Sequence, residues 1–223
     1  MKRYVIKFSK EGSIRYISHL DMHRLFKRSF KRAGIRLQYS QGFNPHPKMS
    51  FAQPLSLGYS GSSEYLEFET AEPYQTGEIL EKANSVMPEG IRLHSCEELP
   101  SGGKSLAALT EAASYEIVIP AEEGFHGNIE TLLKEYIERP QIPVLKYQKK
   151  TGRDLEVDIK PMIAEIHGMV NDNHIMLTMK LSAGSTANLS PEIVLASFCE
   201  FAGISYDRAE VSIGRTEIYF KNN

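Results

Sequence analysis

The order of strand and helix signals along the chain is the feature that most limits its fold. In the first half, segments with period-two alternation and segments with a 3.6-residue period follow the order strand, helix, strand, strand, helix, strand. These segments are residues 4–8, 18–33, 49–51, 64–68, 79–87 and 91–96. That order is typical of a ferredoxin-like sandwich, in which two helices cover one face of an antiparallel sheet.

A stretch rich in Pro, Gly and Ser at residues 99–105 interrupts this pattern, and the pattern then starts again. The second run has strands at 115–119, 163–169, 175–181 and 210–220, helices at 129–138 and 190–201, and an extra hairpin at 144–148 and 155–159. We therefore predict an α+β fold of two ferredoxin-like (βαββαβ) sandwiches in tandem, with antiparallel sheets and a β-hairpin added to the second. The predicted domains are residues 1–98 and 106–223.

The helix predicted over residues 18–33 has a strongly basic face. Ser18 is a suitable N-cap and Gly34 a stop signal, while Met22, Phe26 and Phe30 form an apolar stripe. Five cations project from the opposite side: Arg24, Lys27, Arg28, Lys31 and Arg32. Like charges four residues apart repel one another, and a phosphate backbone would offset this cost by releasing counterions.

The distribution of charge along the chain agrees with a polyanionic partner. The formal net charge is only −2, but residues 1–50 hold 12 Lys and Arg against 2 Asp and Glu, whereas residues 51–140 hold 5 against 16. We favour a nucleic acid as the partner of the basic face. An acidic protein partner, a merely solvated face, and neutralisation by the acids of residues 64–98 are the alternatives.

The loop at residues 39–48 (YSQGFNPHPK) is the most unusual segment. Two prolines restrict its backbone and Gly42 permits a close approach of another backbone. We predict that Phe43, His46 and Lys48 stack an unpaired base and hold its phosphate. The alternative is a rigid connection in which Phe43 caps the core.

Three histidines near this helix leave several alternatives open. His19 and His23 are one helical turn apart, and His46 lies in the following loop. They could form a three-histidine metal site, or supply the acid and base of a metal-independent endoribonuclease. We favour structural or anion-binding roles, and we predict no metal and no cofactor.

Other features exclude several classes of protein. Cys96 and Cys199 are the only cysteines, too few for a disulfide scaffold and too far apart for a CxxC motif. The first eight residues (MKRYVIKF) include three charged side chains and therefore lack the apolar region of a signal peptide. No apolar run reaches about 18 residues. We therefore expect a cytoplasmic protein with no membrane segment.

Four stretches resemble a known bacterial family, the radical-SAM-linked domain of unknown function. They are 15–21 (RYISHLD), 32–34 (RAG), 40–47 (SQGFNPHP) and 54–58 (PLSLG). In many members this domain is fused to the C-terminus of a cobalamin-binding radical SAM protein. The resemblance implies work beside a radical SAM enzyme and, from ribonuclease and ribosomal-protein gene neighbourhoods, an RNA partner such as tRNA or rRNA. It also marks motif positions of unknown role: His19, Asp21, Gly42, Asn44 and Pro45.

This chain differs from the fused members in its cysteines. Two cysteines cannot supply the three ligands of a radical SAM iron–sulfur cluster, so any radical chemistry would come from another protein. The function we predict is a noncatalytic RNA-binding or substrate-presenting module that acts with a separate radical SAM protein. The endoribonuclease that uses His19, His23 and His46, and a purely protein-binding adaptor, are the alternatives.

Overall fold

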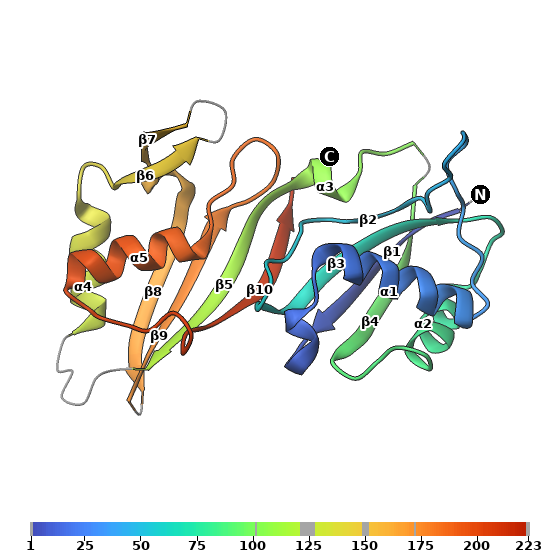
Figure 1. Cartoon of the computed structure of the whole chain (residues 1–223), viewed down its shortest axis with the longest axis horizontal. Coiled ribbons are helices and arrows are strands. Elements are labelled where there is room, and N and C mark those ends of the chain that lie inside the picture. The colour runs from blue at the N-terminus through green and yellow to red at the C-terminus, as the bar shows by residue number, and fades with distance from the viewer. Residues whose placement is uncertain (1, 101, 121–127, 149–151, 172, 222–223) are drawn as a thin grey trace. The chain divides into compact units, whose positions relative to one another are not determined.

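A computed structural model of the chain describes residues 2–100, 102–120, 128–148, 152–171 and 173–221. The chain divides into two compact units. The first is Met1–Glu111 together with Gly214–Asn223, and the second is Ala112–Ile213 (Figure 1). Strands and helices are mixed in both units and most neighbouring strands are antiparallel, which confirms the predicted α+β class.

The first unit contains a sheet in which β4, β1 and β3 are neighbours in that order, all antiparallel. The other edge of β3 pairs with β2 in an antiparallel manner at residues 66–68 and with β10 in parallel at residues 60–61. Its elements are β1 (Lys2–Lys10), α1 (His19–Arg32), β2 (Met49–Phe51), β3 (Ser60–Thr70), α2 (Thr76–Asn84), β4 (Ile91–Leu99), α3 (Leu106–Leu109) and most of β10 (Ser212–Phe220).

The core of the first unit follows from the alternation of β1. Tyr4, Ile6 and Phe8 all point to one face of the sheet and are almost fully buried. The apolar stripe of α1 and residues Ile79 and Ala83 of α2 belong to the same core cluster. Both helices therefore cover one face of this sheet, as the sequence predicted for the first half.

The second unit holds a three-stranded antiparallel sheet in the order β5, β9, β8 and a separate hairpin of β6 and β7. Leu133 and Tyr136 of α4 and Phe198 of α5 are buried in this unit. Its elements are β5 (Thr110–Pro120), α4 (Ile129–Glu138), β6 (Pro143–Gln148), β7 (Arg153–Asp158), β8 (Ile163–Asn171), β9 (His174–Ser182) and α5 (Pro191–Ala202).

The observed division differs from the predicted boundaries of 1–98 and 106–223. Residues 99–111 remain with the first unit, and the chain returns to that unit at Gly214. The physical reason is that β10 pairs with β3, and such long-range pairing leaves no local signal in the sequence. The tandem ferredoxin-like arrangement stays a prediction. Most of β10, the strand expected to complete the second sandwich, belongs to the first unit. Across the described ranges, no helix has the length and apolar character needed to cross a bilayer.

Candidate nucleic-acid interface

The start of α1 is fixed by its capping residue. The Ser18 hydroxyl accepts a hydrogen bond from the Asp21 backbone N–H (3.2 Å) and donates one to the Asp21 carboxylate (2.7 Å). Asp21 also forms an ion pair with Arg24 at 2.9 Å. The hydrogen bond from Ser18 and the nearby Arg24 hold the pKa of Asp21 below its usual value. Ser18 therefore caps the helix, and the negative charge of Asp21 interacts with the Ser18 hydroxyl and Arg24 within the first turn.

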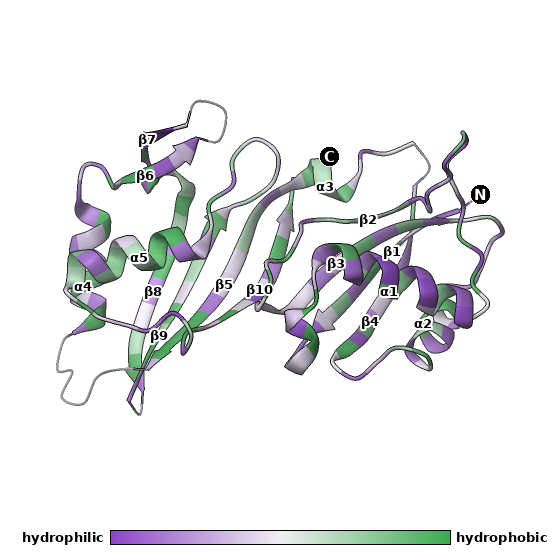
Figure 2. Cartoon of the chain, in the orientation of Figure 1, coloured by the Kyte–Doolittle hydropathy of each residue, from purple (hydrophilic) through white to green (hydrophobic). Residues whose placement is uncertain are grey.

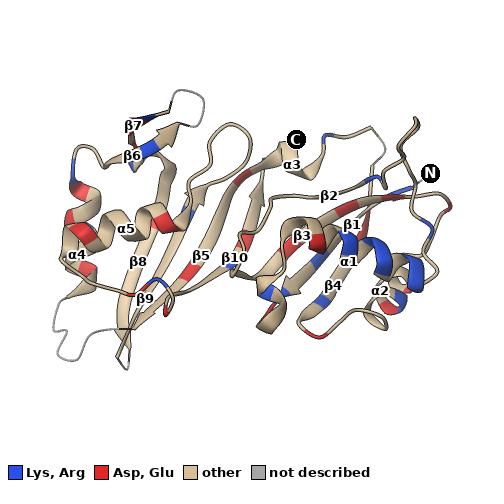
Figure 3. Ribbon diagram, in the orientation of Figure 1, with Lys and Arg blue, Asp and Glu red and all other residues tan. Residues whose placement is uncertain are grey.

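The predicted basic face of α1 is open to solvent. All five of its cations are exposed. In Figure 2 α1 is drawn largely in the hydrophilic colour, and in Figure 3 blue stretches alternate with tan along it. Within the described ranges, Arg24 forms the single ion pair of this face, the one with Asp21. The acids of residues 64–98 bind other cations instead, such as Glu69 with Lys48 and Glu78 with Lys82. Among the residues that the structure describes, the acids at positions 64–98 therefore do not neutralise the basic face of α1.

The cations form two rows, each beside its own hollow. Arg24, Arg28 and Arg32 line a hollow of about 670 Å³ that also touches residues 85–88 after α2. Lys27 and Lys31 line another of about 290 Å³, together with residues 34–37 and Tyr39. The Lys27 ammonium lies 5.6 Å from the centre of the Tyr39 ring. The second hollow thus combines cations with an aromatic face, a combination that suits a phosphate beside a base.

Arg36 and Tyr39 extend the site beyond the predicted residues. Arg36 adds a third cation to the hollow of Lys27 and Lys31 and is itself 3.9 Å from Glu72, and Tyr39 adds the ring. Arg36 lies after the end of α1, so no helical periodicity connects it with the basic face. The signal that could have found it is its position two residues after Gly34, where the chain turns back along the helix.

The loop at 39–48 is braced at its base. Tyr39 and Pro47 form a β-bridge, the Ser40 N–H donates to the His46 carbonyl (2.8 Å), and the His46 N–H donates to the Ser40 hydroxyl (3.0 Å). Phe43 is fully exposed, so it does not cap the core. The motif residues Gly42, Asn44 and Pro45 are exposed as well. Lys48 forms an ion pair with Glu69 at 2.8 Å, which leaves Phe43 and His46 as the predicted binding residues nearest the tip.

The histidines have separate environments. The His19 ring meets the Phe51 ring edge-on at 5.2 Å, and a ring nitrogen of His23 lies 3.2 Å from the Met49 carbonyl. Partial burial, aided by the charges of His23 and Lys10, lowers the pKa of His19. Throughout the part of the chain that the structure describes, no three His, Cys, Asp or Glu side chains are grouped so as to hold a metal ion. The structure therefore does not bring His19, His23 and His46 together as a metal site.

A buried cluster of three charged residues, which the sequence analysis did not find, supports two of the four stretches that carry the family resemblance (the motif segments), residues 15–21 and 54–58. Arg215 donates to both carboxylate oxygens of Glu64 (2.8 and 2.5 Å), and Lys10 is equally buried. The Lys10 ammonium donates to the carbonyls of Arg15 (3.2 Å) and Ile17 (3.3 Å). Arg215 donates to the carbonyls of residues 53 and 54. Burial lowers the pKa of Lys10, while Glu64 opposes that shift.

Both cysteines are poor nucleophiles in this fold. Burial raises the pKa of Cys96 to about 12 and that of Cys199 to about 11. At neutral pH both side chains are therefore thiols, which bind soft metals and react with electrophiles much less well than thiolates do.

Comparison with solved structures gives likenesses at the level of the fold. A chain in the crystal structure of a Cbf5–Nop10–Gar1 complex aligns with a TM-score of 0.52 and 12% identity, over 99% of this chain and 50% of that chain. This chain therefore spans half the length of that relative. An unknown protein from Galdieria sulphuraria aligns over 98% of both chains at 12% identity, with a TM-score of 0.27 that carries no argument.

The sequence comparisons give the family. No curated protein matches the chain. The model of one protein family matches residues 3–191, which is most of the 223 residues and includes α1, the loop at 39–48 and the motif segments. The chain therefore belongs to the family described as uncharacterized proteins conserved in bacteria (DUF2344).

Proposed function

We propose that this chain is a noncatalytic RNA-binding module that presents its RNA, a tRNA or rRNA, to a separate radical SAM protein. The basic face of α1 carries the RNA part of the proposal. It has five exposed cations, and the described residues pair only Arg24 with an acid. Such a face lowers the stability of the free helix. RNA binding would offset this cost, because the cations neutralise phosphates and release the counterions condensed on the RNA into solution.

The two hollows beside α1 give this binding a shape. The arginine row (Arg24, Arg28, Arg32) and the lysine row (Lys27, Lys31) each repeat every four residues, about 6 Å along the helix axis. Each row can therefore follow a stretch of phosphate backbone. Tyr39 offers a ring beside the lysine row, and the exposed Phe43 offers another at the loop tip, where unpaired bases can stack.

The radical SAM part of the proposal is supported by the resemblance of the motif segments. The chain has two cysteines, and burial keeps both as thiols at neutral pH. Iron–sulfur chemistry would therefore be supplied by the partner, with this chain holding the RNA. Affinity purification of the tagged chain from anaerobic cells tests this part. An iron–sulfur protein should copurify, and its absence both with and without nuclease treatment would refute the partnership.

The RNA part is tested with a charge-reversed pair of lysines, Lys27→Glu with Lys31→Glu. Binding of unfractionated bacterial tRNA and of rRNA fragments is measured by fluorescence anisotropy over a range of salt concentrations. We expect the double variant to bind RNA at least about tenfold more weakly, because two cations that contact phosphates become anions. The slope of log Kd against log salt concentration should fall by about two.

The matched control is Lys104→Glu with Lys221→Glu, which changes the net charge equally at two exposed lysines outside α1. This control should bind RNA almost as the wild type does. Equal losses in the two double variants would mean that only overall charge matters, and unchanged binding in the α1 variant would remove the proposal. Competition by poly-glutamate as effective as that by RNA would instead favour the acidic-protein partner.

A further inference from the structure

The strand β8 is an edge strand with little of the protection that edges usually have. It is the last strand in its sheet and, within the described residues, pairs with β9 alone. Its nine residues include no Pro or Lys and one charged residue, Glu165, while Met169 and Val170 are 59% and 45% exposed. A bulge follows Ile163, and residues 165–171 then pair regularly with β9. This edge offers backbone groups to an added strand.

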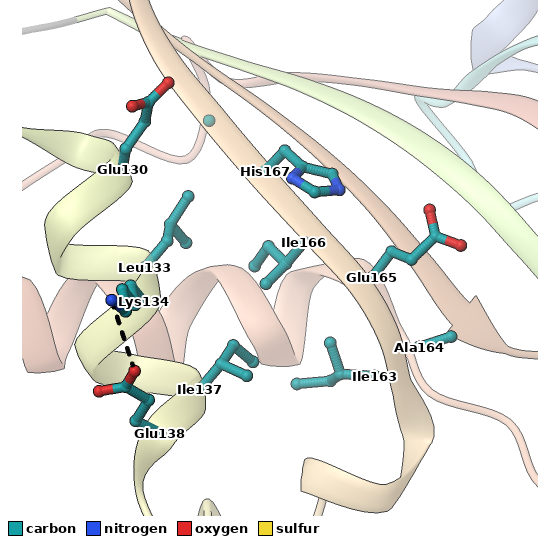
Figure 4. A pocket seen from close by; sticks show the side chains of 11 residues that line it. Glu130, Leu133, Lys134, Ile137, Glu138, Ile163, Ala164, Glu165, Ile166 and His167 are labelled. Carbon is teal, nitrogen blue, oxygen red and sulfur yellow. Dashed lines mark ion pairs between the residues drawn. The ribbon is translucent and has the colours of Figure 1, made fainter.

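A groove runs between this edge and α4. Its volume is about 540 Å³, and Figure 4 shows Leu133 and Ile137 of α4 facing Ile163 and Ile166 of β8 across it. The helix approaches closely at Gly168, where a Cβ atom would lie 2.7 Å from the side chain of Ile129. The groove therefore has apolar walls beside a rigid contact between helix and strand.

The charges around the groove are mainly acidic. Glu130 and Glu138 lie on α4, and the one lysine among the lining residues, Lys134, is 3.9 Å from Glu138. On β8, Glu165 points away from α4 in Figure 4, and it is opposite Lys180 on β9. A strand added to β8 would place alternate side chains against the apolar groove and beside Glu165.

We propose that β8 and this groove bind an extended peptide segment in which apolar residues alternate with lysine or arginine. The segment adds to the sheet as a further strand, so the backbone supplies affinity and the alternation supplies specificity. Its apolar residues contact Ile137 and Ile166, and a cation beside Glu165 continues the opposite-charge ladder that Lys180 begins. A second copy of this chain fits less well, because full antiparallel pairing of two β8 strands places each Glu165 opposite Met169 of the other copy, with no cation beside it. This site is independent of the RNA proposed for α1.

The test uses peptides of about eight residues, an ordinary strand length. One alternates Val and Lys, a second alternates Val and Glu, and a third is the Val–Lys peptide with backbone N-methyl groups on alternate residues. Fluorescence anisotropy should show saturable binding of the first peptide alone. The second peptide is repelled by Glu165, and the third lacks the N–H groups that would donate hydrogen bonds to the backbone of β8. Equal binding of the N-methylated peptide would overturn strand addition.

Glu165→Lys tests the charge preference, with Glu135→Lys as its control on an exposed part of α4 outside the groove. Glu165→Lys should weaken the Val–Lys peptide about fivefold and strengthen the Val–Glu peptide, whereas Glu135→Lys should change neither. Equal effects of the two variants would refute the site. Sedimentation that shows a dimer dispersed by Glu165→Lys would assign the edge to a second copy and overturn the proposal.

Discussion

Glu64 and Arg215 are 151 positions apart in the chain, yet they form a buried ion pair with two hydrogen bonds. Each residue is at most 3% exposed. The full bonding of the arginine to Glu64 and to the carbonyls of residues 53 and 54 makes this burial tolerable. At the residue scale, this pair holds the motif segment that begins at Pro54 in place.

Glu64→Gln should destabilise the protein by about 3–5 kcal/mol, because Arg215 then keeps its charge in a buried site without a counterion. Urea unfolding followed by circular dichroism measures this loss. Replacing both residues together, with Glu64→Leu and Arg215→Met, should recover part of the stability, because Arg215 no longer lacks a counterion but Lys10 stays buried without its acidic neighbour. Glu78→Gln, which breaks an exposed pair with Lys82, is the control and should leave the midpoint nearly unchanged. A similar midpoint for Glu64→Gln and the wild type would contradict this account.

At the scale of the element, α1 combines a stable start with an unfavourable surface. Ser18 and Asp21 satisfy its first turn, and Met22, Phe26 and Phe30 anchor it in the core. Its arginine row places like charges four residues apart, which costs a few tenths of a kcal/mol for each pair. A helix under selection for stability alone would be expected to alternate the charges of this row.

Arg28→Glu should therefore make the free protein more stable, by about 0.5–1 kcal/mol at low salt. Arg28 lies four residues from both Arg24 and Arg32, so the substitution turns two repulsions into two attractions. Thermal unfolding at two salt concentrations measures the gain, which should shrink as salt screens it. The same variant should bind RNA more weakly than the wild type. A loss of stability, or a gain that persists in high salt, would argue against this interpretation of the row.

At the scale of the whole molecule, the last strand returns to the first unit. Gly214 and Arg215 pair with Ser60 and Gly61 of β3, and Glu217 forms an ion pair with Lys7 at 2.9 Å. Together with Arg215 bound to Glu64, these contacts connect the C-terminal residues to β1 and β3. The first unit is thus built from two distant parts of the sequence.

A chain that ends at Ile213 should consequently lose the stability of its first unit, because Glu64 stays buried without a partner and β3 loses a neighbour. We expect a cost of at least about 3 kcal/mol and rapid proteolysis within residues 2–100. A chain that ends at Lys221 retains all of β10 and is the control. Equal protease resistance of the two shortened chains would show that β10 is dispensable.

Local features of the fold and of the candidate site could be predicted from the sequence. The alternation of β1, the cap at Ser18 and the stripe through Phe26 depend on neighbours within a turn or a strand, so their periods are visible in the chain. The exposed cations of α1 follow from the same period. The spacing of His19 and His23 could not decide their role, because a metal site needs a third ligand brought in from elsewhere.

The amino-acid sequence alone determined the α+β class, the basic helix and the membership of residues 3–191 in a bacterial family. Tertiary structure alone decided that the cations lie beside two hollows, that Lys10, Glu64 and Arg215 share a buried site, and that β8 is left at an edge. The reason is physical. Periodicity and capping act over a few residues, whereas strand pairing and charge burial depend on contacts between distant segments, which no local pattern records.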